Sequence, residues 1–146
     1  MIIHEEGYVY NFNYHLVFVT KYRQKIFDTK EKVETMKAIL RRQAEISDVT
    51  VNELEVMSDH VHMLISFKPK YAASNIVKNI KGASARAWFK KYPETKALLW
   101  GGHLWSPSYY MGTLGEMNEE VVENYIASQY TEAMKRQLKG YYGKNK

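Results

Sequence analysis

The segment from His60 to Phe67 constrains this chain most, because every second residue in it is apolar. Those apolar positions are Val61, Met63, Ile65 and Phe67. Successive side chains of a β-strand point to opposite faces of a sheet, so this alternation predicts a strand with one buried face. On the other face, His60 and His62 point the same way and could coordinate one ion between them. The segment therefore predicts a sheet with a core on one side and a histidine pair on the other.

Three further segments are predicted to be strands. Residues 8–20 alternate over most of their length and predict one long strand. Residues 50–57 predict a second strand, joined to the histidine strand by a short turn. A last strand is expected around 104–111, where Pro107 indicates a bulge or a sheet edge.

Two segments with helical periodicity separate these strands. Asp28 is expected to cap a helix that ends at about Ile46, with Glu31 completing a capping box. The range 74–91 carries apolar residues at helical spacing and predicts a second helix.

The C-terminal part of the chain predicts one more helix. Gly112 and Gly115 bracket a flexible joint, and Asn118 then caps a helix over about 118–138. The polar tail 139–146 is expected to be frayed.

The order of these elements, β-α-β-β-α-β-α, predicts an α+β fold. Without its last helix it is the ferredoxin-like split βαβ pattern, a four-stranded antiparallel sheet with two helices on one face. The first and third strands would be central, and their apolar sides would meet the two helices. The opposite face would carry Asn11, Asn13, His15, His60 and His62. Only the extra C-terminal helix remains to cover that face.

That helix carries a second pair of candidate residues. Tyr125 and Gln129 lie four positions apart and therefore share a helix face. On the predicted topology they converge with His60 and His62, which gives a metal site with a nucleophile beside it. The chain has no cysteine, so the donor set favours a hard divalent ion such as Mg or Mn. A histidine pair alone is more often ordinary packing, and it is the convergence that favours a site.

Length and charge restrict the class of protein. The expectation for 146 residues is one domain over 1–146. Net charge of +5 and a pI of about 9.2 are consistent with a polyanionic partner. No apolar run approaches the roughly 18 residues of a membrane span, so a cytoplasmic protein without a membrane partner is expected.

Five blocks, in order along the chain, carry a resemblance to a known family. The blocks are Tyr14–Arg23, Ser58–Ile65, Lys81–Arg86, Leu104–Tyr110 and Tyr125–Gln129. Together they resemble the transposases of the insertion sequence 200/605 family, small single-tyrosine HUH enzymes named after a His-hydrophobic-His motif. The match runs from about Tyr8 to about Leu138.

The resemblance implies a concrete activity. Members cut and rejoin single-stranded DNA at the ends of a mobile element and recognise hairpins near those ends. Carried over by position, Tyr125 is the nucleophile, and His60, His62 and Gln129 hold the metal. The intermediate would be a 5′-phosphotyrosine. Members are homodimers in which the tyrosine helix of one subunit can complete the site of the other.

Other residues have weaker support. Candidates for DNA phosphate contacts are Lys21, Arg23, Lys25, Lys78, Lys81 and Arg86, each about as well explained as a solvated basic face. Trp105, Tyr109 and Tyr110 could stack on bases, although packing is the favoured interpretation. His15 could touch DNA or support a ligand, and Asp59 could orient a histidine. Glu132 is not expected to be a ligand.

Two alternatives remain open at this point. The first is a related HUH nickase, either a replication initiator or a domesticated enzyme that processes chromosomal repeats; the DNA flanking the gene would distinguish it. The second is a non-catalytic nucleic-acid-binding module of the same fold. Such modules usually place aromatic residues on the open faces of their central strands, where this chain has asparagine and histidine.

Overall fold

The computed structural model describes residues 3–5, 8–10, 13–99, 101–113 and 118–129. Its strands are β1 (Ile3–Glu5), β2 (Tyr8–Tyr10), β3 (Tyr14–Val19), β4 (Val49–Val56), β5 (His60–Phe67) and β6 (Tyr110–Thr113). The helices are α1 (Lys30–Ile46) and α2 (Ala73–Lys91), with short 3-10 turns η1 (Lys21–Arg23) and η2 (Pro93–Leu98). Residues 119–129 form a further helix, the C-terminal helix. In these ranges no helix is long and apolar enough to span a membrane.

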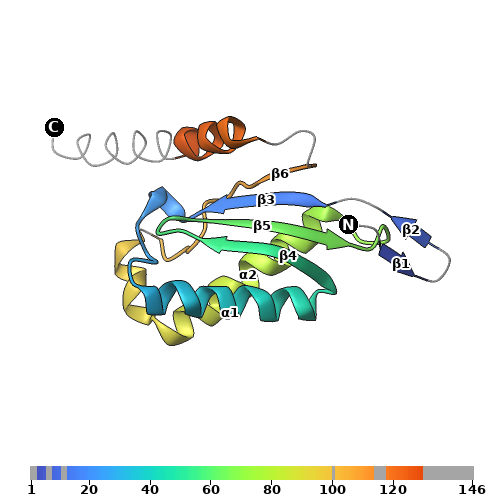
Figure 1. The fold of residues 1–146 in the computed structure, drawn as a ribbon. Coiled ribbons are helices and arrows are strands. Elements are labelled where there is room, and N and C mark those ends of the chain that lie inside the picture. The colour runs from blue at the N-terminus through green and yellow to red at the C-terminus, as the bar shows by residue number, and fades with distance from the viewer. Residues whose placement is uncertain (1–2, 6–7, 11–12, 100, 114–117, 130–146) are drawn as a thin grey trace.

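Four strands form an antiparallel sheet in the order β4-β5-β3-β6. The two strands predicted to be central, β3 and β5, are central. Helices α1 and α2 cover one face of this sheet, the closed face, and the C-terminal helix lies on the other, the open face (Figure 1). The predicted ferredoxin-like α+β fold with an added helix is therefore confirmed.

The alternation of β3 divides its side chains between the two faces. Leu16 and Phe18 are completely buried in the main core, which fills the space between the sheet and helices α1 and α2. Val17 and Val19 point to the open face, where they form a small cluster with Ile126 of the C-terminal helix. The same strand thus anchors a large core on one side and a small one on the other.

The long strand predicted over residues 8–20 is divided in the structure. Residues Tyr8–Tyr10 form β2, which pairs with β1 in a separate two-stranded sheet, and the strand of the main sheet begins at Tyr14. At this point the Asn13 side chain is buried and accepts hydrogen bonds from Ser66 and Asn52. Alternation shows that a segment is extended, but it cannot show which partner the segment pairs with.

The last strand also differs from its prediction over 104–111. Pro107 lacks an N–H group, and regular pairing in β6 begins only after it, at Tyr110. Before it, Trp105 forms an isolated bridge with Thr20, and the amide of Ser106 donates to the carbonyl of Val19 at 2.9 Å. The strand lies at the sheet edge, which is one of the two positions that the proline indicated.

Two local details near helix ends are also corrected. The N-cap of α1 is Thr29, whose hydroxyl accepts from the amide of Lys32 at 3.2 Å, whereas Asp28 forms an ion pair with the Lys32 ammonium. Asp and Thr cap almost equally well, so the sequence could not choose, and the shift by one residue removes Glu31 from the capping-box position. Gly112 is buried within β6 opposite His15 rather than in a joint; Gly115 and the ranges 130–138 and 139–146 lie outside the described residues.

Candidate active site

The two histidines of β5 lie on the open face, as their alternation predicted. Val61 and Met63 beside them are completely buried on the closed face, whereas His60 and His62 are only half-buried. In the sheet register, His62 lies between Val17 of β3 and Glu55 of β4. Both imidazoles line a cavity of about 560 Å³ between the sheet and the C-terminal helix.

The orientation of His60 is fixed by a chain of polar contacts. Its Nδ1 is hydrogen-bonded to Asp59 Oδ1 at 2.8 Å, and Asp59 Oδ2 accepts from Arg23 Nε at 2.9 Å. Burial opposes ionisation of Asp59, but the hydrogen bonds from His60 and Arg23 outweigh it and hold the pKa of that carboxyl below its usual value. Asp59 thus orients His60 as a carboxylate orients a ligating histidine, and Arg23 holds Asp59 in place.

His62 is held by a third histidine. His15 Nδ1 and His62 Nε2 are hydrogen-bonded at 2.8 Å, and the two ring centroids are 5.0 Å apart. Burial lowers the pKa of His62, and the neighbouring His15 lowers it further. A lowered pKa keeps the imidazole neutral, which is the form that ligates metals.

The C-terminal helix begins as predicted, with Asn118 as its cap. The Asn118 side-chain oxygen accepts from the amide of Val121 at 2.9 Å. Val122 and Ile126, one helical turn apart, pack on Val17 and Val19 of β3 and fix the helix to the sheet.

Two pairs of residues flank this apolar contact on opposite sides of the helix. Glu119 and Glu123 lie toward β5 and line the cavity that contains the histidines. Tyr125 lies toward β6, where its ring centroid is 5.8 Å from that of Tyr110. At about 100° per residue, the Tyr125 and Gln129 pair is rotated by about 120° from the glutamate pair.

Tyr125 and Gln129 contact the loop that precedes β6. Ser106 Oγ and Ser108 Oγ donate to Gln129 Oε1 at 3.1 and 2.7 Å, and the hydroxyls of Ser108 and Tyr125 are 2.9 Å apart. Because Ser108 gives its single hydrogen to Gln129, the phenol of Tyr125 donates to Ser108. Burial raises the pKa of the Tyr125 phenol, so the hydroxyl is protonated near neutral pH.

The structure therefore holds the predicted site residues in two groups. His15, His60 and His62 form one group, and Tyr125 with Gln129 forms the other, beside Ser106 and Ser108. No hydrogen bond within the described ranges joins the two groups. In the same ranges, no cluster of three or more His, Cys, Asp or Glu side chains could hold a metal ion. Their convergence stays a prediction.

Sequence reasoning missed that Ser106 and Ser108 hold Gln129, and it named Lys81 only as a candidate phosphate contact. Lys81 of α2 donates from its ammonium to the carbonyls of Ser106 and Ser108 at 2.7 and 2.9 Å. Burial lowers the pKa of Lys81 to about 8. Two serines flanking a proline were the available signal, but a lysine that binds main-chain carbonyls leaves no pattern in a sequence.

The other residues predicted to contact DNA lie at several positions on the molecule. Lys25 and Lys78 are exposed, and Lys21 lies over the ring of Tyr22. Arg86 is exposed on α2 and lines a second cavity. Trp105 is buried in the main core, edge-on to Phe18, and its indole N–H donates to Ser84 at 3.0 Å, which confirms the packing interpretation for this residue.

Comparison with known proteins shows the family of this chain over most of its length. The family model described as "Transposase IS200 like" matches residues 8–129. The chain belongs to this transposase family. It is 44% identical over 124 residues to the ISDra2 transposase TnpA of Deinococcus radiodurans, covering 85% of this chain and 88% of that protein. It is 32% identical over 123 residues to the transposase for insertion sequence element IS200 of Salmonella typhimurium, covering 84% and 80%.

Solved structures extend the similarity of this IS200-like transposase to three dimensions. A crystal structure of a protein from Deinococcus radiodurans R1 superposes with a TM-score of 0.82 at 39% identity, covering 88% of this chain and 98% of that one. A REP-associated tyrosine transposase, solved bound to a REP hairpin, has a TM-score of 0.52 at 13% identity, covering 93% and 74%. The second likeness supports the shared fold alone.

Proposed function

We propose that this transposase cuts and rejoins single-stranded DNA through Tyr125, assisted by a divalent metal ion held by His60, His62 and Gln129. The observation that carries the proposal is that one sheet face holds both histidines and also the helix that bears Tyr125 and Gln129. Membership of the family supports DNA cleavage and transfer as the reaction class.

The residues on the open face fit a metal site. Asp59 is hydrogen-bonded to Nδ1 of His60, so Nε2 is the nitrogen of His60 that would ligate. Nε2 of His62 is hydrogen-bonded to His15 and would exchange that bond for the metal. Two neutral imidazoles and an amide oxygen would leave an Mg or Mn ion its full charge. When bound, the ion would neutralise phosphate charge and orient the phosphate for in-line attack.

The covalent step is a balanced exchange of phosphate esters. Tyr125 Oη forms a bond to phosphorus as the bond from phosphorus to the DNA 3′-oxygen breaks, giving a 5′-phosphotyrosine and a free 3′-hydroxyl. The phenol gives up its proton and the leaving 3′-oxygen takes one up. In the reverse step a 3′-hydroxyl attacks the phosphotyrosine, so no nucleotide cofactor is needed.

Assembly of the site requires a different placement of Tyr125 and Gln129 from the one seen within a single chain. Both side chains are held by Ser106 and Ser108 on the β6 side of the helix. We propose that the active form is a homodimer in which the C-terminal helix of one chain can serve the histidines of the other. The cluster that fixes this helix to the sheet is small, so releasing the helix would expose little apolar surface.

The proposed substrate is single-stranded DNA that carries hairpins, as at the ends of a mobile element. A REP-associated tyrosine transposase of the same fold is solved bound to a REP hairpin, which supports a substrate that carries hairpins. DNA flanking the gene tests the biological role: hairpins near both ends of an element support transposition, and dispersed repeats would favour the domesticated alternative.

The decisive experiment removes one oxygen atom. Tyr125→Phe should abolish cleavage and the covalent protein–DNA adduct on denaturing gels while hairpin binding stays within about twofold, because only the phenolic hydroxyl is lost. Tyr110→Phe, whose ring lies beside Tyr125, is the matched control and should retain the adduct. An adduct in the Tyr125→Phe protein would move the nucleophile to another tyrosine.

A further inference from the structure

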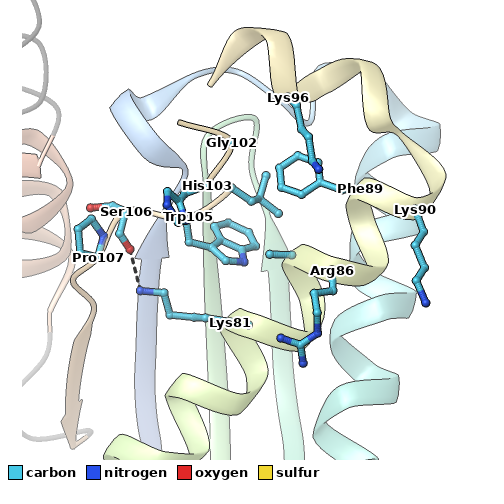
Figure 2. A pocket seen from close by; sticks show the side chains of 13 residues that line it. Lys81, Arg86, Phe89, Lys90, Lys96, Gly102, His103, Trp105, Ser106 and Pro107 are labelled. Atoms are coloured by element: carbon cyan, nitrogen blue, oxygen red, sulfur yellow. Dashed lines mark hydrogen bonds between the residues drawn. The ribbon is translucent and has the colours of Figure 1, made fainter. Parts of the chain in front are cut away.

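A second cavity, of about 620 Å³, lies between α2 and residues 102–107 (Figure 2). It is separate from the histidine cavity. Its lining includes the basic side chains Lys81, Arg86, Lys90, Lys96 and His103, and none of the described residues that line it is acidic. An anionic ligand would therefore meet attraction on several sides and no opposing carboxylate.

Three of these cations are uncompensated. Arg86, Lys90 and Lys96 are exposed, and none of them forms an ion pair in the described part of the chain. Elsewhere carboxylates neutralise several cations, as Asp59 neutralises Arg23 and Asp48 neutralises Lys68. Three cations without an ion pair in the described part of the chain thus line one cavity.

The cavity also has an aromatic surface and room for the guanidinium. Lys96 Nζ lies 5.1 Å from the centroid of the half-buried Phe89 ring, and Figure 2 shows this pair at one end of the cavity. A Cβ built on Gly82 would lie 3.3 Å from Nη1 of Arg86, so glycine at this helical position leaves the guanidinium its space. Cations around an aromatic ring are the chemistry that holds an unpaired nucleic-acid strand.

One wall of the cavity leads directly to the candidate nucleophile. Ser106 lines the cavity, its carbonyl accepts from Lys81, and its hydroxyl donates to Gln129. Ser108, two residues further on, contacts Tyr125. The Lys81 ammonium is used in holding this loop, so the cations available to a ligand are Arg86, Lys90 and Lys96.

We propose that this cavity binds the phosphates of a single DNA strand on its approach to Tyr125, with Arg86, Lys90 and Lys96 as the phosphate contacts. This inference rests on the proposed function and adds a substrate-binding site to it. A single strand fits better than a duplex, because only an unpaired strand offers base faces to Phe89 as well as phosphates to the cations.

The test compares two triple variants that remove the same charge. One is Arg86→Gln, Lys90→Gln and Lys96→Gln in the cavity; the matched control is Lys30→Gln, Lys37→Gln and Arg41→Gln on α1. Binding of a labelled oligothymidine strand and of a blunt DNA hairpin is measured by fluorescence anisotropy. The cavity variant should bind oligothymidine at least tenfold more weakly, and its salt slope should fall by about 2, since each single-strand phosphate contact contributes about 0.7. The affinity of the cavity variant for the hairpin should change less than about threefold. The affinity of the control variant for either ligand should also change less than about threefold.

Equal losses in the two triple variants would overturn the proposal, because net charge alone would then explain them. A loss confined to the hairpin would also overturn it. Arg86→Lys keeps the charge and should retain most of the affinity, which separates a charge effect from damage to the fold. The Tyr125 adduct assay distinguishes the two levels. If the wild-type protein forms the adduct and the cavity variant binds oligothymidine normally, only the proposed binding site is wrong. If the wild-type protein forms no adduct, the proposed function is wrong, and the binding comparison stays valid.

Discussion

The two faces of the sheet are built in different ways. The closed face buries Leu16, Phe18, Met63 and Trp88 completely beneath α1 and α2, in one continuous core. Among the described residues, the open face buries Val17, Val19 and Ile126 in a small cluster of its own, and it also carries histidines, serines and carboxylates. The large core therefore lies on one face and the proposed site on the other.

The largest expected effect belongs to the open face. His62→Ala should lower cleavage by at least two orders of magnitude, because the proposed metal ion would lose a ligand, and should leave the free energy of unfolding nearly unchanged. A chelator should stop wild-type cleavage, and Mg or Mn should restore it. Cleavage rates on a single-stranded substrate measure both effects; full wild-type activity in chelator would falsify the metal-assisted mechanism.

The proposed exchange of the C-terminal helix between two chains is tested by complementation. Tyr125→Phe and His62→Ala are each inactive alone under the proposal, but a mixed dimer would join the intact helix of the second to the intact histidines of the first. After subunit exchange, the mixture should recover part of the wild-type cleavage. If the mixture shows no cleavage although mixed dimers are verified by mass, each chain uses its own helix.

A matched pair of valines tests the difference in stability. Val61 is completely buried on the closed face, and Val19 is 1% exposed on the open face. Val61→Ala should lower the free energy of unfolding by about 2 kcal/mol, since two methyl groups are lost inside a rigid core. Val19→Ala should cost less than about 1 kcal/mol, because the C-terminal helix can settle onto the smaller side chain. Urea titrations followed by tryptophan fluorescence provide both values, and equal losses would contradict the comparison.

A dependence of stability on pH is expected from Lys81, which joins the two regions by reaching from α2 to the loop beside Tyr125. Its pKa is lowered to about 8 by burial, from 10.5 in the unfolded chain. Between these values the unfolded chain binds more protons, so stability should rise with pH from about 8 toward 10.5. Below about 8 both states are protonated, so this group adds no pH dependence there. Urea unfolding at both ends of the window should show a rise that Lys81→Met lacks. If the free energy of unfolding of the variant rises with pH as steeply as that of the wild type, Lys81 is not the cause of the rise.

Most of the fold could be predicted because the spacing of apolar residues shows which face of each strand or helix is buried. The strand His60–Phe67 has its predicted bounds, and α1 and α2 end where predicted. The errors occurred where the outcome depends on a distant partner. Residues 8–10 pair with β1 instead of extending β3, and carbonyls of the segment before β6 bind Lys81 instead of a strand.

For the site, the sequence by itself determined that the histidine pair shares one sheet face and that Tyr125 and Gln129 share one helix face. Both results follow from backbone geometry, which repeats every two residues in a strand and every 3.6 in a helix. Only the tertiary structure decided the rotation of the C-terminal helix, which places Glu119 and Glu123 over the histidines and Tyr125 toward β6. That rotation depends on how Val122 and Ile126 pack on β3 and on the serines that hold Gln129. These contacts join residues far apart in the chain, and no local pattern encodes them.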